Sequence, residues 1–200
     1  LESNHLWTLP EEIGALTKLK KLDFSSNELR ELPSGIGKLT KLTSLNFYDN
    51  QLIELPKEIG NLKKLLKLTL RFNKLRNLPT EMTKLSKLKH LDLSYNKLCT
   101  LPSKIGDLIQ LKHLDLYRNK LRQIPEEISN LTSLEYLDLK ENELTDLPAA
   151  IENFSKLKHL DFSRNKLQKL KFKLEKLSKL THLGLRANEI LELHIGLSKL

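Results

Sequence analysis

The sequence predicts an α/β solenoid, a horseshoe of short coils with a parallel β-sheet on its concave face and short helical or 3₁₀ turns on its convex face. Asparagine recurs every 23 residues without insertion, proline follows at the same spacing, and leucines alternate with polar residues between them. Such a fixed period is typical of arrays whose units stack on their neighbours. The asparagines are Asn4, Asn27, Asn50, Asn73, Asn96, Asn119, Asn142, Asn165 and Asn188, and the prolines are Pro10, Pro33, Pro56, Pro79, Pro102, Pro125 and Pro148.

The repeat places the whole chain, 1–200, in one expected domain. Counted from Leu88, Asn96 is the ninth residue of its repeat and Pro102 the fifteenth. A partial repeat covers residues 1–18, full repeats run from residue 19, and the last repeat, 180–200, is incomplete. Neither end shows the polar cap that usually shields a terminal coil. We therefore expect either a fragment without caps, which we favour, or an array whose uncapped ends pair into a homodimer.

Each repeat is expected to begin with a strand. In LKHLDL, residues 88–93, two leucines alternate with His90 and Asp92, which is the period of a half-buried strand. Burial of the seven apolar side chains of a repeat stabilises it by roughly 10–20 kcal/mol, whereas ordering its 23 residues costs roughly 35 kcal/mol of conformational entropy. A single repeat therefore cannot fold alone, and the array is stabilised by stacking.

The recurring asparagine and proline have structural explanations. Asparagine carries both donors and an acceptor, so it can pair backbone groups in its own coil and the next. Proline fixes its backbone dihedral and offers no donor, which suits a rigid turn into the convex side. The segment SKIGDL, residues 103–108, should then form a short helix or 3₁₀ turn.

These motifs resemble a known family. LKHLDLSYNKLCTL, residues 88–101, matches the leucine-rich repeat pattern LxxLxLxxNxLxxL, and LPSKI, residues 101–105, matches the LPxxI ending of its 23-residue class. Segments such as LPKEIGNLKKLLKLTLRFNKL, residues 55–75, resemble the lysine-rich repeat proteins of bacterial spirochaetes. This resemblance implies a secreted or cell-surface protein that binds a protein partner. Similar repeats in eukaryotic scaffolds imply the alternative, a cytoplasmic scaffold for a small GTPase-like partner.

Composition narrows the function classes. A single cysteine, Cys99, excludes a disulfide framework, and no phosphate loop, zincin helix or nucleophile elbow appears. We therefore expect no enzyme, no catalytic residue and no cofactor. The net charge of +9 lies mainly on the back and edges of the expected array. Because the concave face is about neutral, we expect no nucleic-acid partner, and without a long apolar run we expect no membrane span.

Partner-binding residues are expected on the concave face, where the third, fifth and seventh positions of successive repeats form columns and the eighth lies near the sheet edge. All four tyrosines fall in these columns beside one phenylalanine and several cations. Tyrosine and arginine are enriched at protein interfaces, although tyrosine also suits a half-exposed strand as packing. The predicted site is Tyr48, Arg71, Phe72, Tyr95, Tyr117, Arg118, Tyr136 and Lys140.

Histidine and aspartate share the same columns. One group is His90, Asp92, His113 and Asp115, and a second is His159, Asp161 and His182. Imidazole and carboxylate at strand spacing could hold a divalent transition metal. Duplication of the repeat explains the same residues without selection for a metal. We therefore predict no metal site, and keep a metal-binding or self-assembling repeat protein as an alternative.

Overall fold

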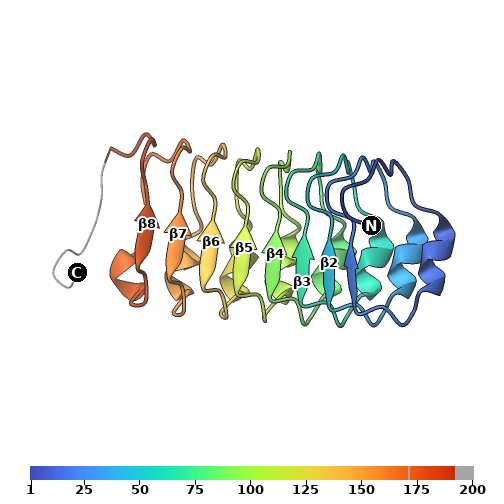
Figure 1. The fold of residues 1–200 in the computed structure, drawn as a ribbon. Helices are drawn as coiled ribbons and strands as arrows, with labels where there is room; N and C mark the ends of the chain where they lie inside the picture. The colour runs from blue at the N-terminus through green and yellow to red at the C-terminus, as the bar shows by residue number, and fades with distance from the viewer. Residues whose placement is uncertain (171, 192–200) are drawn as a thin grey trace.

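The computed structural model describes residues 1–170 and 172–191, and these form a curved stack of coils (Figure 1). Short strands and 3₁₀ helices alternate along these residues, beginning with a helix and ending with a strand. The strands are β1 (Lys21–Asp23), β2 (Ser44–Asn46), β3 (Lys67–Thr69), β4 (His90–Asp92), β5 (His113–Asp115), β6 (Tyr136–Asp138), β7 (His159–Asp161) and β8 (His182–Gly184). The helices are η1 (Glu11–Ala15), η2 (Ser34–Lys38), η3 (Lys57–Asn61), η4 (Thr80–Lys84), η5 (Ser103–Asp107), η6 (Glu126–Asn130), η7 (Ala149–Asn153) and η8 (Leu174–Lys176).

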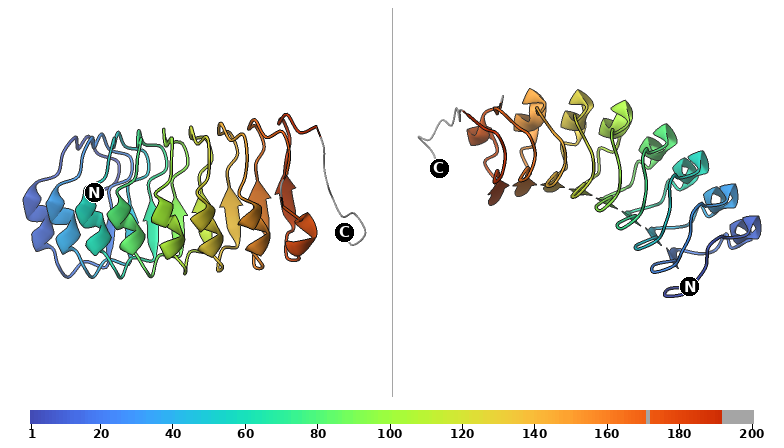
Figure 2. Two further views of the ribbon diagram at one scale, coloured as in Figure 1. Left: turned by 180° about the vertical axis from the view of Figure 1, so that it is seen from behind. Right: turned by 90° about the horizontal axis from the view of Figure 1, so that it is seen from above.

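The strands form one parallel sheet in chain order, β1 to β8. Every pair keeps a register of 23 residues, so His90 pairs with His113 and Asp92 with Asp115. Seen along the strands, the coils form an arc with the sheet on its inner side and the helices on its outer side (Figure 2). This confirms the predicted solenoid and its 3₁₀ turns, and it turns each repeat position into a column across the concave face.

Leucine and isoleucine fill the space between sheet and helices. In the fourth repeat, Leu91, Leu93, Leu98 and Ile105 have no exposed surface. Phenylalanine replaces leucine at some core positions, as where Phe24 and Phe47 stack at 5.7 Å between ring centroids. Burial of each such side chain is worth about 1.5–3 kcal/mol, and the buried side chains of successive coils form one core cluster.

The repeated asparagines link one coil to another through the backbone. Asn96 accepts the N–H of Leu75 on Oδ1 at 3.0 Å, and its Nδ2 donates to the carbonyls of Leu70 at 2.9 Å and Leu93 at 3.0 Å. Two of these partners lie in the preceding coil, whereas the sequence analysis expected the next one. The role is otherwise as predicted, because the amide satisfies backbone groups that the turning chain leaves unpaired.

A proline precedes each helix from η1 to η7 on the convex side, as at Pro56, where the backbone is extended with φ −66° before η3. Lys173 precedes η8 instead. Neighbouring helices approach closely at a glycine: a Cβ on Gly60 would lie 2.3 Å from the backbone oxygen of Glu81. The close packing of η3 against η4 therefore requires glycine here. Within the described part of the chain, no helix has the length and apolar character that crossing a bilayer requires.

Candidate partner-binding surface

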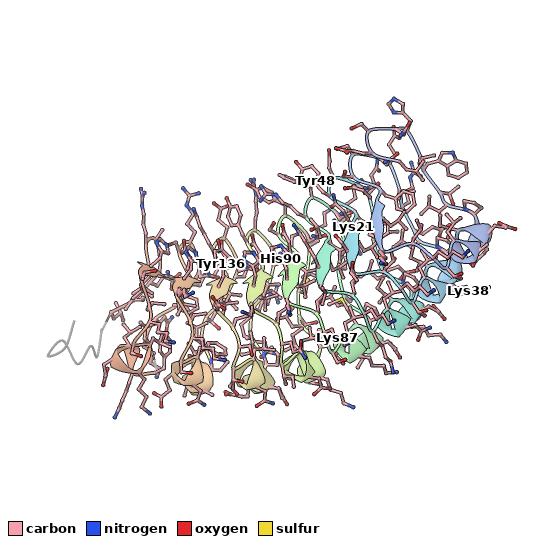
Figure 3. The ribbon with its side chains drawn as sticks, turned by 60° about the horizontal axis from the view of Figure 1, so that its bottom comes forward. Lys21, Lys38, Tyr48, Lys87, His90 and Tyr136 are labelled. Atoms are coloured by element: carbon pink, nitrogen blue, oxygen red, sulfur yellow. The ribbon has the colours of Figure 1, made fainter. Side chains whose placement is uncertain are left out.

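The concave face carries two rows of aromatic rings. We call the first the edge ladder, which is Tyr48, Phe72, Tyr95 and Tyr117, and the second the central ladder, which is His90, His113, Tyr136, His159 and His182. Figure 3 shows Tyr48, His90 and Tyr136 on the sheet side of the array, whereas Lys38 lies on the helix side. The register thus gathers side chains from distant parts of the chain on one wall.

The edge ladder consists of four rings in continuous contact. The rings of Tyr48 and Phe72 meet edge to face at 5.7 Å, those of Phe72 and Tyr95 stack at 4.1 Å, and those of Tyr95 and Tyr117 meet edge to face at 5.0 Å. Aromatic pairs in these arrangements are worth about 0.5–1.5 kcal/mol beyond burial. All four side chains remain half-buried, so they keep surface for a partner.

Cations lie over the faces of these rings. The guanidinium of Arg71 is 4.9 Å from the ring centroids of both Phe72 and Tyr95, and that of Arg118 is 5.2 Å from Tyr95. The Lys140 ammonium is 5.4 Å from the Tyr117 ring. A cation in this position gains about 0.5–1 kcal/mol at an exposed site, so the ladder is held in a defined arrangement.

Two ladder residues occupy an unusual backbone conformation. The eighth position of every repeat is left-handed, and Phe72 and Tyr95 adopt it with φ of 55° and 53°. A bulky side chain there costs about 1–2 kcal/mol. The conformation turns the chain at the end of each strand, and the stacked pair of rings offsets part of its cost.

Seven of the eight predicted residues belong to this surface, as the four rings of the edge ladder and the three cations over them. Phe72, Tyr95 and Arg118 line an open hollow of ≈ 320 Å³, together with Asp49, three of the repeated asparagines, Lys74 and Lys97. Lys74 and Lys97 were not among the residues predicted from the sequence. Both occupy the tenth position of their repeats, directly after the asparagine, and Lys120 occupies the same position in the next repeat. This column of lysines is the sequence feature that could have identified them.

Tyr136, the eighth predicted residue, lies in the central ladder instead. Its ring stacks on His113 at 4.1 Å and on His159 at 4.3 Å, with interplanar angles of 11° and 8°. Burial, followed by the charge of His90, lowers the pKa of His113 to about 4, so that imidazole is neutral at pH 7. The sequence identified these residues but not the stacking, because the repeat fixes strand positions and not ring orientations.

A column of aspartates separates the two ladders. Asp92, Asp115 and Asp138 each accept the backbone N–H two residues further on, at 3.0, 2.9 and 2.8 Å. These bonds hold the chain as it leaves the strand, so the fifth-position aspartate has a structural role that the sequence analysis did not assign. Burial raises the pKa of Asp115 to about 7, and the carboxylates of Asp92 and Asp138 add to the shift.

Of the two histidine–aspartate groups, the second brings its potential ligand atoms close together. One ligand atom from each of His159, Asp161 and His182 lies within 4.8 Å of the others, and this is the one such group in residues 1–170 and 172–191. His90, Asp92, His113 and Asp115 do not form a group of this kind, although the rings of His90 and His113 stack at 4.1 Å.

Comparison with known families agrees with the fold. A family model described as a leucine-rich repeat region matches residues 99–200. Leucine-rich repeat models also match residues 63–121, and residues 18–39 and 41–62. No curated protein matches the chain.

Solved structures with the same architecture are similar over most of the chain. A leucine-rich repeat protein of Leptospira interrogans is 33% identical with a TM-score of 0.76, covering 98% of this chain and 64% of that protein. The plant peptide hormone receptor RGFR1, solved in complex with RGF2, is 30% identical with a TM-score of 0.75, covering 90% of this chain and 38% of the receptor. InlJ of Listeria monocytogenes is 25% identical with a TM-score of 0.63, covering 94% and 48%. The chain therefore spans less than two thirds of the length of these proteins.

Proposed function

Because the chain belongs to the leucine-rich repeat family, we propose that it is a non-enzymatic module that binds a protein partner on its concave face. Members of this fold are typically interaction modules, and the similar plant receptor was solved with its peptide ligand. We further propose that the protein is secreted or lies on a bacterial cell surface, since the Leptospira protein supports the spirochaete resemblance.

The edge ladder is the observation that carries this proposal. Its rings are preformed and half-exposed, and Arg71, Arg118 and Lys140 lie over them. Interface hot spots are enriched in tyrosine and arginine. Because the side chains already hold one another in place, a partner that docks here loses little conformational entropy. We assign the ladder and these three cations to partner binding, with Tyr136 as the neighbouring contact from the central ladder.

The charge of this surface suggests the chemistry of the partner. Lys74, Lys97 and Arg118 contribute to the wall of the hollow, and Asp49 is the one acidic side chain among its lining residues. A partner segment that presents carboxylates beside aromatic or aliphatic side chains would match both the cations and the rings. We propose such an acidic, partly apolar segment as the ligand.

The test begins with affinity capture by the whole chain from host extracellular fluid and from bacterial extracts. The bait is compared with a Tyr95→Ala/Tyr117→Ala variant and with Ile109→Ala as a matched control, because Ile109 is 56% exposed and outside both ladders. The affinity of a captured protein is then measured by titration. We expect the double variant to weaken binding by at least about 10-fold, which corresponds to 1.4 kcal/mol, and Ile109→Ala to leave it unchanged.

Two results would count against the proposal. One is an affinity of the double variant within twofold of the parent while circular dichroism shows both folded. The other is equal loss in the Ile109→Ala variant, which would place the contact at the turn between η5 and β5 and away from the ladders.

A further inference from the structure

We propose that His159, Asp161 and His182 form a binding site for one divalent transition-metal ion, of which Zn²⁺ is the best match. The three side chains come from β7 and β8, and one ligand atom from each lies within 4.8 Å of the others. Two imidazoles and one carboxylate are ligands that Zn²⁺ prefers, and three protein ligands leave a coordination position open. This site is separate from the edge ladder and does not depend on the proposed partner.

His159 brings a nitrogen that lacks a partner. Its Nε2 is buried and neither accepts nor donates a hydrogen bond. In the described part of the chain it is the one buried side-chain nitrogen or oxygen without a hydrogen-bond partner. Leaving a buried polar atom unpaired is unfavourable by about 1–3 kcal/mol. The stack with Tyr136 at 4.3 Å and with His182 at 4.2 Å holds the ring in place. With Nε2 as the ligand atom of His159, a bound ion would satisfy an atom that the fold leaves unsatisfied.

Asp161 is anchored through one carboxylate oxygen, and its other oxygen lies near His182. Its Oδ1 accepts the backbone N–H of Ser163 at 2.7 Å, and its Oδ2 lies 3.8 Å from Nε2 of His182. Carboxylates that bind a metal are commonly oriented by a second hydrogen bond of this kind. The hydrogen bond to Ser163 therefore presents the free oxygen to the imidazole on the neighbouring strand.

Gly184 explains why only this group is gathered. It occupies the position of the aspartate column on β8, and a Cβ there would lie 2.0 Å from Oδ1 of Asp161. The carboxylate of Asp161 thus uses space next to β8 that a side chain would fill. For Asp92, the neighbouring residue on the next strand is Asp115, which carries a side chain of its own. The glycine distinguishes the second histidine–aspartate group from the first.

Binding requires a small closure. Ligand atoms about 2.0–2.2 Å from Zn²⁺ in a tetrahedral site lie roughly 3.4 Å apart. Since the three ligand atoms lie within 4.8 Å of one another, the widest pair must approach by at most about 1.4 Å. The imidazoles of His159 and His182 are stacked with an interplanar angle of 3°, and one ring must turn out of the stack towards the ion. His182 can do so because half of its side chain is exposed.

The test is isothermal titration of ZnCl₂ into the tag-free whole chain at about 20 µM. His182→Gln and Asp161→Asn should each lower the affinity by about 10-fold or more. His182→Gln alters an exposed side chain, and Asp161→Asn keeps the acceptor for Ser163, so both variants should stay folded. His113→Gln is the matched control, because His113 lies in the same ladder but outside the proposed site. This variant should bind Zn²⁺ as the parent does.

A second readout is the visible absorption of bound Co²⁺, which reports coordination geometry directly. We expect the parent and His113→Gln to develop the intense bands of a four-coordinate site at one equivalent, and His182→Gln to lose them. The proposal is overturned if ZnCl₂ gives no heat above buffer. It is equally overturned if His113→Gln weakens binding as much as His182→Gln does, since that would show adventitious binding to surface imidazoles.

Discussion

At the residue scale, the same repeat position serves the fold and the surface together. Asp115 holds the end of β5 through the Tyr117 N–H at 2.9 Å, yet it lies between Asp92 and Asp138 on the adjacent strands. Burial disfavours its charge, the two neighbouring carboxylates add to this, and Arg71 opposes them. The column therefore stabilises the strand ends by hydrogen bonding while its central member is electrostatically unfavourable.

This conflict gives a pH-dependent prediction for Asp115→Asn. Because the folded pKa of about 7 lies above the ordinary aspartate value of 3.8, ionisation of Asp115 disfavours folding, and stability falls as pH rises through that window. Asparagine keeps the acceptor without the charge. We expect its melting temperature to exceed that of the parent by about 2–4 °C at pH 8, roughly 1 kcal/mol for a chain of this size, and to match it at pH 3.5.

Asp23→Asn supplies the control with opposite sign. Burial alone would raise the pKa of Asp23, but hydrogen bonds from Ser25 and Asn46 bring it below its usual range. Its carboxylate therefore stabilises the fold above the ordinary aspartate pKa, and this contribution is lost as pH falls through the folded pKa. A higher melting temperature for Asp23→Asn at pH 8, or a lower one for Asp115→Asn, would contradict the assignment.

At the element scale, the coils differ in how closely their helices can approach. Gly60 in η3 faces the backbone oxygen of Glu81 in η4, whereas Ser129 occupies the same repeat position in η6 and already carries a Cβ. The closeness of neighbouring helices therefore differs between repeats and depends on whether the residue at this repeat position is glycine.

Gly60→Ala tests that statement. A Cβ 2.3 Å from the Glu81 oxygen forces the two coils apart, and overpacking of this kind is destabilising by about 1–3 kcal/mol. We expect a lower midpoint in urea unfolding for Gly60→Ala. Ser129→Ala should change it by less than about 1 kcal/mol, since only the hydroxyl bond to the Glu126 carbonyl is lost. Equal midpoints for Gly60→Ala and the parent would contradict the steric account.

Much of each element follows from the sequence, and the remainder depends on side-chain orientation. The 23-residue period places the strands, the 3₁₀ turns and the core, because apolar spacing and proline determine them locally. The period does not reveal that Asn96 bonds to the preceding coil, or that Asp92 accepts the Ser94 N–H. Those hydrogen bonds depend on the left-handed backbone conformation at the eighth position of each repeat. The pattern of residue types in the sequence does not show this conformation.

At the scale of the whole molecule, the surface follows from the register. The third, seventh and eighth positions of eight coils become columns, which bring the four rings of the edge ladder together although up to 69 residues separate them. The sequence predicted which residues share the concave face. It did not predict that Tyr136 stacks with histidines, that Lys74 and Lys97 line the hollow, or that Gly184 accommodates Asp161.

The most direct test of the central claim is hydroxyl-radical footprinting of the chain alone and with its captured partner. If a partner docks on the edge ladder, Tyr48, Phe72, Tyr95 and Tyr117 will lose reactivity together on binding, in four segments spaced about one repeat apart. Exposed Trp7 and Cys99 should stay reactive in both states. Unchanged reactivity of the four rings, with protection on the 3₁₀ helices instead, would contradict it.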